Sequence, residues 1–275
     1  MPRKTPEPLL AHQNIVFLES DAGRQVRILS EFLAPDTTLA KEDIRNTIVF
    51  FGSARTLSTS EIKKRRKKAQ DPKEIEKLDR LSKVAKYYDA CHELSKRLGK
   101  WANARREGYA ICTGGGPGIM EAGNRGASDV GTPSIGFNIK LPFEQHANPY
   151  ITPELNMQFR YFFIRKFWFL FRAQALIVFP GGFGTLDEMF EALTLIQTHK
   201  LYQVMPVVLF GTEYWQKLIN WDFLAETGMI DKNDMKILHF SDSVEDAYKY
   251  ITSELERVKK KTPSTGGFHA FSSLK

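Results

Sequence analysis

The sequence predicts an α/β fold in which a doubly wound, mainly parallel β-sheet carries helices on both faces. Three observations support this prediction. Short apolar runs without polar alternation recur along the chain, segments with helical spacing separate them, and glycine clusters follow several of the runs. Strands that are apolar throughout are buried on both faces, and parallel strands joined by right-handed helical crossovers produce this arrangement.

Each expected strand is an apolar run that is bounded by small or turn-forming residues. The first run is closed by Gly52 and Ser53, and the fourth by Pro180 and Gly181. The five expected strands are Thr47–Phe51, Tyr109–Cys112, Ser134–Ile139, Ala175–Phe179 and Pro206–Phe210.

The expected helices are segments in which apolar residues recur at helical spacing. A closing helix is expected over Glu245–Lys260 with Ser243 as its N-terminal cap, and some helix is expected around Gln25–Phe32. The helices expected between the strands are Tyr87–Arg106, Ile119–Ser128, Phe159–Gln174 and Leu186–Gln197.

One domain is expected over residues 46–260, after a lead-in over residues 1–45. A charged insertion over about residues 57–82 separates the first strand from its crossover helix. The last residues, 261–275, are rich in Thr, Pro, Ser and Gly, and such a composition predicts a disordered tail.

The charge of the chain is concentrated in one segment. The chain has 39 Lys and Arg against 32 Asp and Glu, and this formal charge of +7 suggests a nucleic-acid partner. The segment from Arg55 to Lys86 holds 12 basic and 5 acidic residues, so the rest of the chain is neutral. No aromatic residue lies within the run Lys63–Lys68 to stack a base. We therefore expect a solvated, partly helical insertion, with nucleic-acid binding as the less favoured alternative.

The cysteines and the apolar stretches exclude several classes of protein. Cys91 and Cys112 lie in apolar patterns without partners at metal-ligand spacing, which indicates neither a disulfide framework nor a zinc site and favours a reducing, cytoplasmic location. Residues Met1–Pro8 do not resemble a secretory signal. The most apolar stretch, Tyr161–Phe179, holds three basic residues and is too charged to span a bilayer, so no membrane partner is expected.

A glycine turn with the residues of an anion site connects the fourth strand to the next helix. It contains Gly181, Gly182 and Gly184, and Thr185 adds a hydroxyl donor. Backbone N–H groups at a helix N-terminus hold an anion, and glycine lets a phosphate approach the main chain closely. The structural alternative is a tight turn that only requires positive φ.

A second cluster, Gly114-Gly115-Gly116, also stands between a strand and a helix. Both turns are therefore expected to face one crevice at the carboxyl edge of the sheet. Ile119 stands where the dinucleotide fingerprint requires its third glycine, and neither loop ends in the Gly-Lys-Ser/Thr of a P-loop. The loops favour a nucleoside monophosphate held by backbone amides without a metal over NAD or a nucleoside triphosphate with magnesium.

Charged residues on the flanking helices are candidates for chemistry. Glu188 and Glu191 share one helix face, and Asp187 points about a quarter turn away. One interpretation is that these acids only interact favourably with the helix dipole at the start of the helix. The other is that they reach the ribose hydroxyls and the anomeric carbon of a bound nucleotide. Arg165 and Arg172 fall on one side of the preceding helix, where an arginine is expected to bind phosphate or orient the glutamate.

Three motifs together resemble the signature of the LOG family. The resemblance covers roughly Ile48–Phe210. The family contains cytokinin riboside 5′-monophosphate phosphoribohydrolases and related bacterial AMP-cleaving enzymes, long mislabelled lysine decarboxylases. The motifs are Gly114-Gly115-Gly116-Pro117-Gly118-Ile119-Met120-Glu121-Ala122, then Arg165-Lys166, then Pro180-Gly181-Gly182-Phe183-Gly184-Thr185-Leu186-Asp187-Glu188.

The resemblance implies roles for individual residues. Arg165 and Glu188 are the implied catalytic pair, with Lys166 beside the arginine. The family also implies a Rossmann-like fold, a homodimer with active sites near the subunit interface, and no metal or organic cofactor. The implied phosphate loop is Gly181, Gly182, Gly184 and Thr185, and the implied ribose and base side is Asp187, Glu191 and Thr194.

The expected reaction is hydrolysis of the N-glycosidic bond of a purine nucleoside 5′-monophosphate, AMP or an N6-substituted AMP, to the free base and ribose 5-phosphate. Glu188 is expected to be held ionised by Arg165, since a neighbouring positive charge lowers the pKa of a carboxylate. The alternative is a non-catalytic nucleotide-binding protein. The charged insertion, the longer lead-in and tail, and the segment Leu141–Gln145 resemble the longer bacterial subgroup and leave the preferred base open.

Overall fold

The computed structural model describes residues 8–142, 146–201 and 205–261. These residues form a seven-stranded sheet in the order β4-β3-β2-β1-β5-β6-β7, and every neighbouring pair is parallel. The expected doubly wound α/β fold is confirmed. The strands are β1 Asn46–Phe51, β2 Tyr109–Thr113, β3 Ser134–Ile139, β4 Asn156–Phe159, β5 Ala173–Val178, β6 Val207–Phe210 and β7 Leu238–Ser241.

Two apolar cores lie on opposite faces of the sheet. Alternate residues of β1 supply them: Val49 and Phe51 belong to one core, and Ile48 and Phe50 to the other. Because β1 is apolar on both faces, it is buried from Thr47 onwards. The helices α5 (Ala85–Arg105), α6 (Ile119–Ser128) and α11 (Val244–Lys261) pack on the Ile48 face. The helices α2 (Arg24–Lys41), α7 (Phe162–Phe171), α8 (Phe183–Gln197), α9 (Thr212–Leu218) and α10 (Trp221–Glu226) contribute to the core on the Val49 face.

The central strand β1 lies between β2 and β5. The first glycine turn (114–116) follows β2 and the second (181–184) follows β5, so the two turns flank the carboxyl end of β1. In open parallel sheets, ligands bind at this edge where the strand order reverses. The topology therefore brings both glycine turns to one place.

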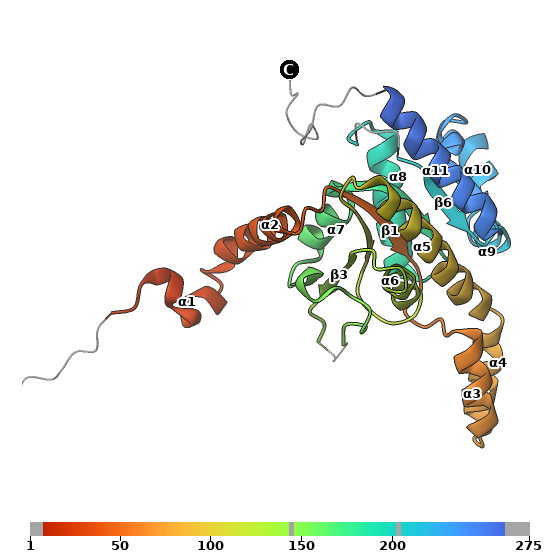
Figure 1. The fold of residues 1–275 in the computed structure, drawn as a ribbon, viewed down its shortest axis with the longest axis horizontal. Helices are drawn as coiled ribbons and strands as arrows, with labels where there is room; N and C mark the ends of the chain where they lie inside the picture. Colours follow the sequence, from red (N-terminus) through yellow and green to blue (C-terminus); the bar gives the residue numbers. More distant parts are fainter. Residues whose placement is uncertain (1–7, 143–145, 202–204, 262–275) are drawn as a thin grey trace, which may run out of the picture.

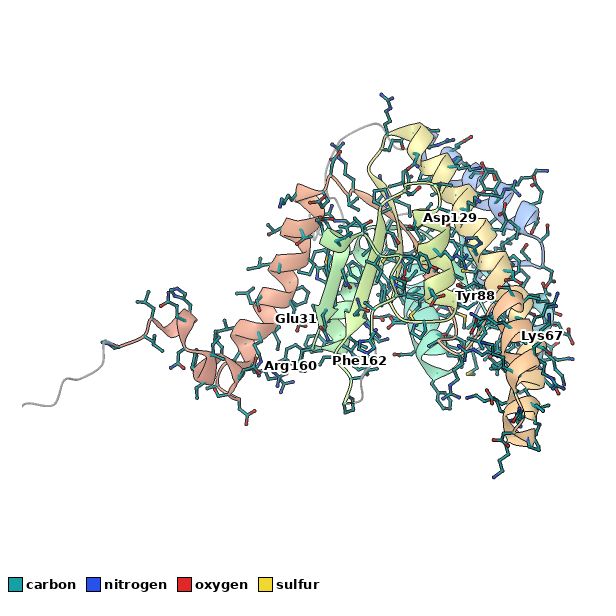
Figure 2. All side chains as sticks on the ribbon, turned by 60° about the horizontal axis from the view of Figure 1, so that its bottom comes forward. Glu31, Lys67, Tyr88, Asp129, Arg160 and Phe162 are labelled. Atoms are coloured by element: carbon teal, nitrogen blue, oxygen red, sulfur yellow. The ribbon has the colours of Figure 1, made fainter. Side chains whose placement is uncertain are left out.

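The charged insertion, which was expected to be partly helical, is a hairpin of two helices. It consists of α3 (Thr59–Lys68) and α4 (Pro72–Ser82), which project from the body at the lower right of Figure 1. Ser58 and Asp71 cap the two helices, and an ion pair of 3.0 Å between Arg66 and Asp79 joins them. Lys67 lies on the exposed side of the hairpin in Figure 2.

The lead-in is more helical than expected. It contains the short 3₁₀ helix η1 (Ala11–Gln13), α1 (Ile15–Glu19) and the 18-residue α2, and Figure 1 shows α1 at the far end of an arm that extends away from the sheet. The expected helix Gln25–Phe32 is part of α2, which continues through Pro35.

Several element boundaries differ from the prediction. The helix expected over Phe159–Gln174 shortens to α7, because its first residue ends β4 and its last residues begin β5. The helix expected from Leu186 begins at Phe183, so Gly184 and Thr185 belong to its first turn. The strands β4 and β7 and the helices α9 and α10 were not predicted, nor were the 3₁₀ helices η2 (Pro153–Leu155) and η3 (Asp234–Ile237).

The end of the described chain agrees with the prediction. The closing helix is α11, and the Ser243 hydroxyl accepts the backbone N–H of Asp246 at 3.4 Å. The predicted tail beyond residue 261 and positions 143–145 of the subgroup motif lie outside the described residues. Within the described ranges, no helix is long and apolar enough to cross a bilayer.

Candidate active site

A cluster of five charged side chains forms where α7 meets α8. Arg165 Nη2 lies 3.5 Å from Glu188 Oε1, so the predicted catalytic pair is in contact. Lys166 Nζ lies 2.9 Å from Asp187 Oδ1, 3.0 Å from Glu191 Oε2 and 3.8 Å from Glu188 Oε2. Two cations on α7 therefore face three carboxylates on α8.

Glu188 is the most buried acid of the cluster. Its side chain is 7% exposed, against 33% for Glu191 and 59% for Asp187. Burial, the largest cause, raises the pKa of Glu188 from 4.5 to about 7, and the charges of Lys166 and Arg165 offset this only in part. Arg165 lowers the pKa of Glu188 as expected, but burial outweighs both cations, so the net pKa is raised and not lowered.

The guanidinium of Arg165 is enclosed by aromatic rings. Its Cζ lies 5.0 Å from the centre of the Phe162 ring and 5.4 Å from that of Phe169. Burial is the largest influence and lowers the pKa of Arg165, while Glu188 and Asp187 raise it. The buried Nε atom has no hydrogen-bond partner within the described residues. The rings thus orient a cation whose donors are not all used.

Lys166 differs from Arg165 in its balance of influences. Burial, the largest single influence, lowers the pKa of Lys166, but hydrogen bonds to Asp187 and Glu191 and the nearby charge of Glu188 raise it overall. The ammonium group is therefore held protonated between the acids of α8. It links Glu188 to both of the more exposed carboxylates.

The second glycine turn leaves open space beside its main chain. A Cβ built on Gly181 would lie 2.1 Å from Thr185 Oγ1, so glycine is needed there for packing. A Cβ on Gly182 or Gly184 would meet nothing within 4 Å. None of these glycines has positive φ, which contradicts the structural alternative of a turn that needs left-handed residues. The absence of side chains at 182 and 184 leaves the first turn of α8 accessible to a ligand.

The first glycine turn lies against the charged cluster. A Cβ on Gly114 would lie 4.0 Å from Arg165 Nη1. Gly115 has a φ of +72°, and a Cβ there would collide with Asn138, so this turn does require glycine. The two glycine turns and the Arg165–Glu188 pair therefore occupy one region of the carboxyl edge.

A main-chain bridge joins the two turns. The N–H of Ser53, just beyond β1, donates to the carbonyl of Pro180 at 3.0 Å. The carbonyl of Ser53 accepts the N–H of Ile119 at 3.0 Å. The end of the central strand is thus bonded to the residue before the second turn and to the first residue of α6, the helix that follows the first turn.

Sequence reasoning missed a buried polar network that orders the first glycine turn. Asn148 Nδ2 lies within hydrogen-bond distance of the carbonyls of Gly115 and Gly116, both at 3.0 Å, and of Asn124 Oδ1 at 2.8 Å. The Thr113 hydroxyl donates to the same Asn124 oxygen at 2.6 Å. Asn148 follows the segment 143–145, and no motif signal marked it in the sequence.

Two of the predicted residues lie apart from the cluster. The hydroxyl of Thr194 donates to the carbonyl of Phe190 at 2.7 Å on an exposed part of α8. Arg172 binds Asp36 of α2 at 2.6 Å and the carbonyl of Ile44, so it anchors the lead-in. Of Arg165 and Arg172, Arg165 is the one that contacts the glutamate.

One further contact supports the second glycine turn from outside. The hydroxyl of Tyr214, on α9, donates to the carbonyl of Gly181 at 2.7 Å. Within the described part of the chain, no group of three or more His, Cys, Asp or Glu residues is arranged to hold a metal ion.

The chain is similar to known proteins over part of its length. Residues 120–251 match the model of the family described as "Possible lysine decarboxylase". A segment of 82 residues is 37% identical to the cytokinin riboside 5′-monophosphate phosphoribohydrolase of Mycobacterium tuberculosis, covering 28% of this chain. The match spans 42% of that relative's length, which is less than half of it.

Solved structures are similar to this chain at low sequence identity. The molybdenum cofactor carrier protein of Chlamydomonas reinhardtii matches with a TM-score of 0.50 and 18% identity, over 77% of this chain and 99% of that one. The molybdenum cofactor binding protein of Rippkaea orientalis matches with a TM-score of 0.46 and 17% identity, over 76% and 96% of the two chains.

The family match includes the part of the chain that holds the charged cluster. The model covers the segment that carries Arg165, Lys166 and the second glycine turn. Residues 120–251 thus match the model of the family described as "Possible lysine decarboxylase", and the expected resemblance to the LOG family is confirmed over that segment.

Proposed function

We propose that this chain hydrolyses the N-glycosidic bond of a purine nucleoside 5′-monophosphate, AMP or an N6-substituted AMP, to the free base and ribose 5-phosphate. The observation that carries the proposal is the buried carboxylate of Glu188, whose pKa is raised to about 7, on the second turn of a helix that begins in an open glycine turn. The name of the partial relative, a nucleoside monophosphate phosphoribohydrolase, supports the same substrate class.

The second glycine turn supplies the phosphate site in this proposal. Glycine in a helix costs about 0.5–1 kcal/mol relative to alanine. Gly184 lies in the first turn of α8 with room for a Cβ, so packing within the chain gives no reason for this cost. A phosphate that approaches the N–H groups at the start of α8 does give one, and the helix dipole favours its charge.

Glu188 acts on the water molecule and on the anomeric carbon. A group with a pKa near the working pH exchanges protons most effectively, and burial raises the pKa of Glu188 to about 7. The ionised carboxylate accepts a proton from water as the water oxygen bonds to C1′ and the bond from C1′ to the base nitrogen breaks. The bond electrons leave with the base, which takes up a proton from solvent, and the carboxylate stabilises the positive charge that develops on the ribose.

The two cations of α7 position the reacting groups. Arg165 contacts one oxygen of Glu188 and lies beside the first glycine turn, so it orients the carboxylate toward the space between the two turns. Lys166 holds Asp187 and Glu191 on the side where the ribose hydroxyls are expected. Both cations keep the pKa of Glu188 lower than burial alone would set it.

Release of adenine from AMP tests the proposal. Purified protein is incubated with AMP and with N6-substituted AMP, and the free base and ribose 5-phosphate are separated by chromatography. We expect base release by the wild type and at least a 100-fold lower rate for Glu188→Gln, of the order seen when a general acid–base group is removed. Glu226→Gln is the matched control, since it makes the same exchange at an exposed carboxylate on α10, outside the charged cluster, and should retain the rate.

Two outcomes would contradict the proposal in different ways. If Glu188→Gln releases adenine at the wild-type rate, the role assigned to Glu188 is wrong. If AMP binds saturably and no purine nucleoside monophosphate loses its base over hours, the chain is a nucleotide-binding protein without this activity.

A further inference from the structure

A cavity of about 340 Å³ lies between the start of α5 and α9, outside the Arg165–Glu188 cluster. Its volume is within the range of small-molecule sites. Tyr214 lines it, and the hydroxyl of this tyrosine holds the carbonyl of Gly181. The polar residues of its lining are Lys83, Lys86, Tyr87, Glu213, Tyr214 and Lys217.

The lining carries more positive than negative charge. Lys217 is paired with Glu213 at 2.6 Å, whereas Lys83 and Lys86 have no ion-pair partner within the described residues. The carboxylate of Asp242 is nearby and accepts the backbone N–H of Thr212 at 3.0 Å. Two lysines therefore remain available to an anion.

The surroundings reinforce this charge. Lys83 and Lys86 belong to the segment Arg55–Lys86, which holds the entire +7 surplus of the chain. The α3–α4 hairpin, which carries most of that surplus, contacts the start of α5 and projects beside it in Figure 1. A field of one sign around a recess raises the local concentration of oppositely charged ligands.

The side chain of Tyr87 forms part of the cavity wall. Tyr87 is 7% exposed and lines the cavity, and no hydrogen bond to its hydroxyl is present within the described ranges. Its ring and hydroxyl lie against Gly211, where a Cβ would come within 2.8 Å of the ring and 3.0 Å of the hydroxyl oxygen. The hydroxyl is therefore available to donate to a ligand oxygen or nitrogen in the cavity.

We propose that this cavity is a second anion site that binds a nucleoside phosphate. The rings of Tyr87 and Tyr214 and the aliphatic side chains beside them accommodate a flat apolar group, and Lys83 and Lys86 bind the phosphates. The Tyr87 hydroxyl supplies a directional hydrogen bond. A ligand in the cavity stabilises the hydrogen bond from Tyr214 to the carbonyl of Gly181 and so acts on the second glycine turn. Only this effect on the second glycine turn rests on the proposed function.

Calorimetric titration with ADP tests the site in the full-length chain. We expect saturable binding by the wild type, and about a 10-fold or greater loss of affinity in Lys83→Glu/Lys86→Glu, since two charge-assisted contacts become repulsive. Tyr87→Phe should weaken ADP binding by about 3- to 10-fold through loss of one hydrogen bond. The matched control is Lys64→Glu, an exposed change on the hairpin away from the cavity, for which we expect less than a 2-fold change.

Further arms separate the possible sources of binding. Arg165→Ala should retain the ADP binding that the cavity variants lose, and adenosine and inorganic phosphate should each bind more weakly than ADP. The proposal is overturned if the double variant binds ADP as tightly as the wild type, if Lys64→Glu loses as much, or if Arg165→Ala abolishes the binding. None of these results depends on adenine release, so the site and the proposed activity succeed or fail separately.

Discussion

Replacing Glu188 with glutamine should stabilise the folded protein at high pH and have little effect at low pH. The pKa of Glu188 is raised from 4.5 to about 7, so the folded state holds this proton more tightly than the unfolded chain does. Glu188 therefore contributes stability that is fully present below pH 4.5 and is lost as the pH rises through about 7. At 1.36 kcal/mol per pKa unit, the ionised form costs about 3 kcal/mol above pH 8.

Urea denaturation of the wild type and of Glu188→Gln at a series of pH values measures this cost. Glutamine resembles the protonated carboxyl, so the difference between the two proteins should grow by about 3 kcal/mol between the acidic and the alkaline end of the series, in favour of the variant. Glu191→Gln, in contact with the same lysine but one-third exposed, should change by less than about 1 kcal/mol. A difference that stays constant with pH, or that favours the wild type at high pH, would refute the reasoning.

Three further predictions concern residues around the site. Gly184→Ala should raise the free energy of unfolding by about 0.5–1 kcal/mol, measured by urea denaturation, and weaken AMP binding at least 10-fold, measured by titration. Gly181→Ala should instead lower the free energy of unfolding by about 1–3 kcal/mol, because its Cβ would collide with Thr185. Asn148→Ala removes the side-chain donor to the carbonyl of Gly116, while the backbone N–H of residue 148 still donates to Gly115, and should cost about 1–3 kcal/mol in the same denaturation experiment; a cost below about 0.5 kcal/mol would contradict the network. Arg172→Met should lower stability by about 1–3 kcal/mol while adenine release per folded molecule stays unchanged, and a loss of that activity would show that Arg172 acts in the site.

The central part of the fold could be predicted because its signals are local. The strands β1, β2, β3, β5 and β6 are buried on both faces and read as continuous apolar runs. The strands β4 and β7 are edge strands of four residues with a partner on one side only, and their sequences mix polar and apolar residues. Nothing in such short segments distinguishes them from loops, because their pairing is decided by the neighbouring strand.

The candidate site could be predicted only where chemistry depends on residue type and spacing. Arg165 and Glu188 meet as their motifs imply, since both helices adjoin the carboxyl edge of the sheet. The direction of the pKa shift of Glu188 could not be predicted, because it depends on how much solvent the packed helices exclude. The destination of Arg172 depends on α2, a helix far away in sequence.

The bridge made by Ser53 shows that a residue can matter here without its side chain. Both links from this position to the two glycine turns use main-chain atoms, while its hydroxyl only accepts the N–H of Arg55. Every residue except proline retains the N–H that binds Pro180, so replacing the side chain leaves the connection in place. Alanine scanning would therefore score position 53 as unimportant, although its main chain connects the residues that border the two glycine turns.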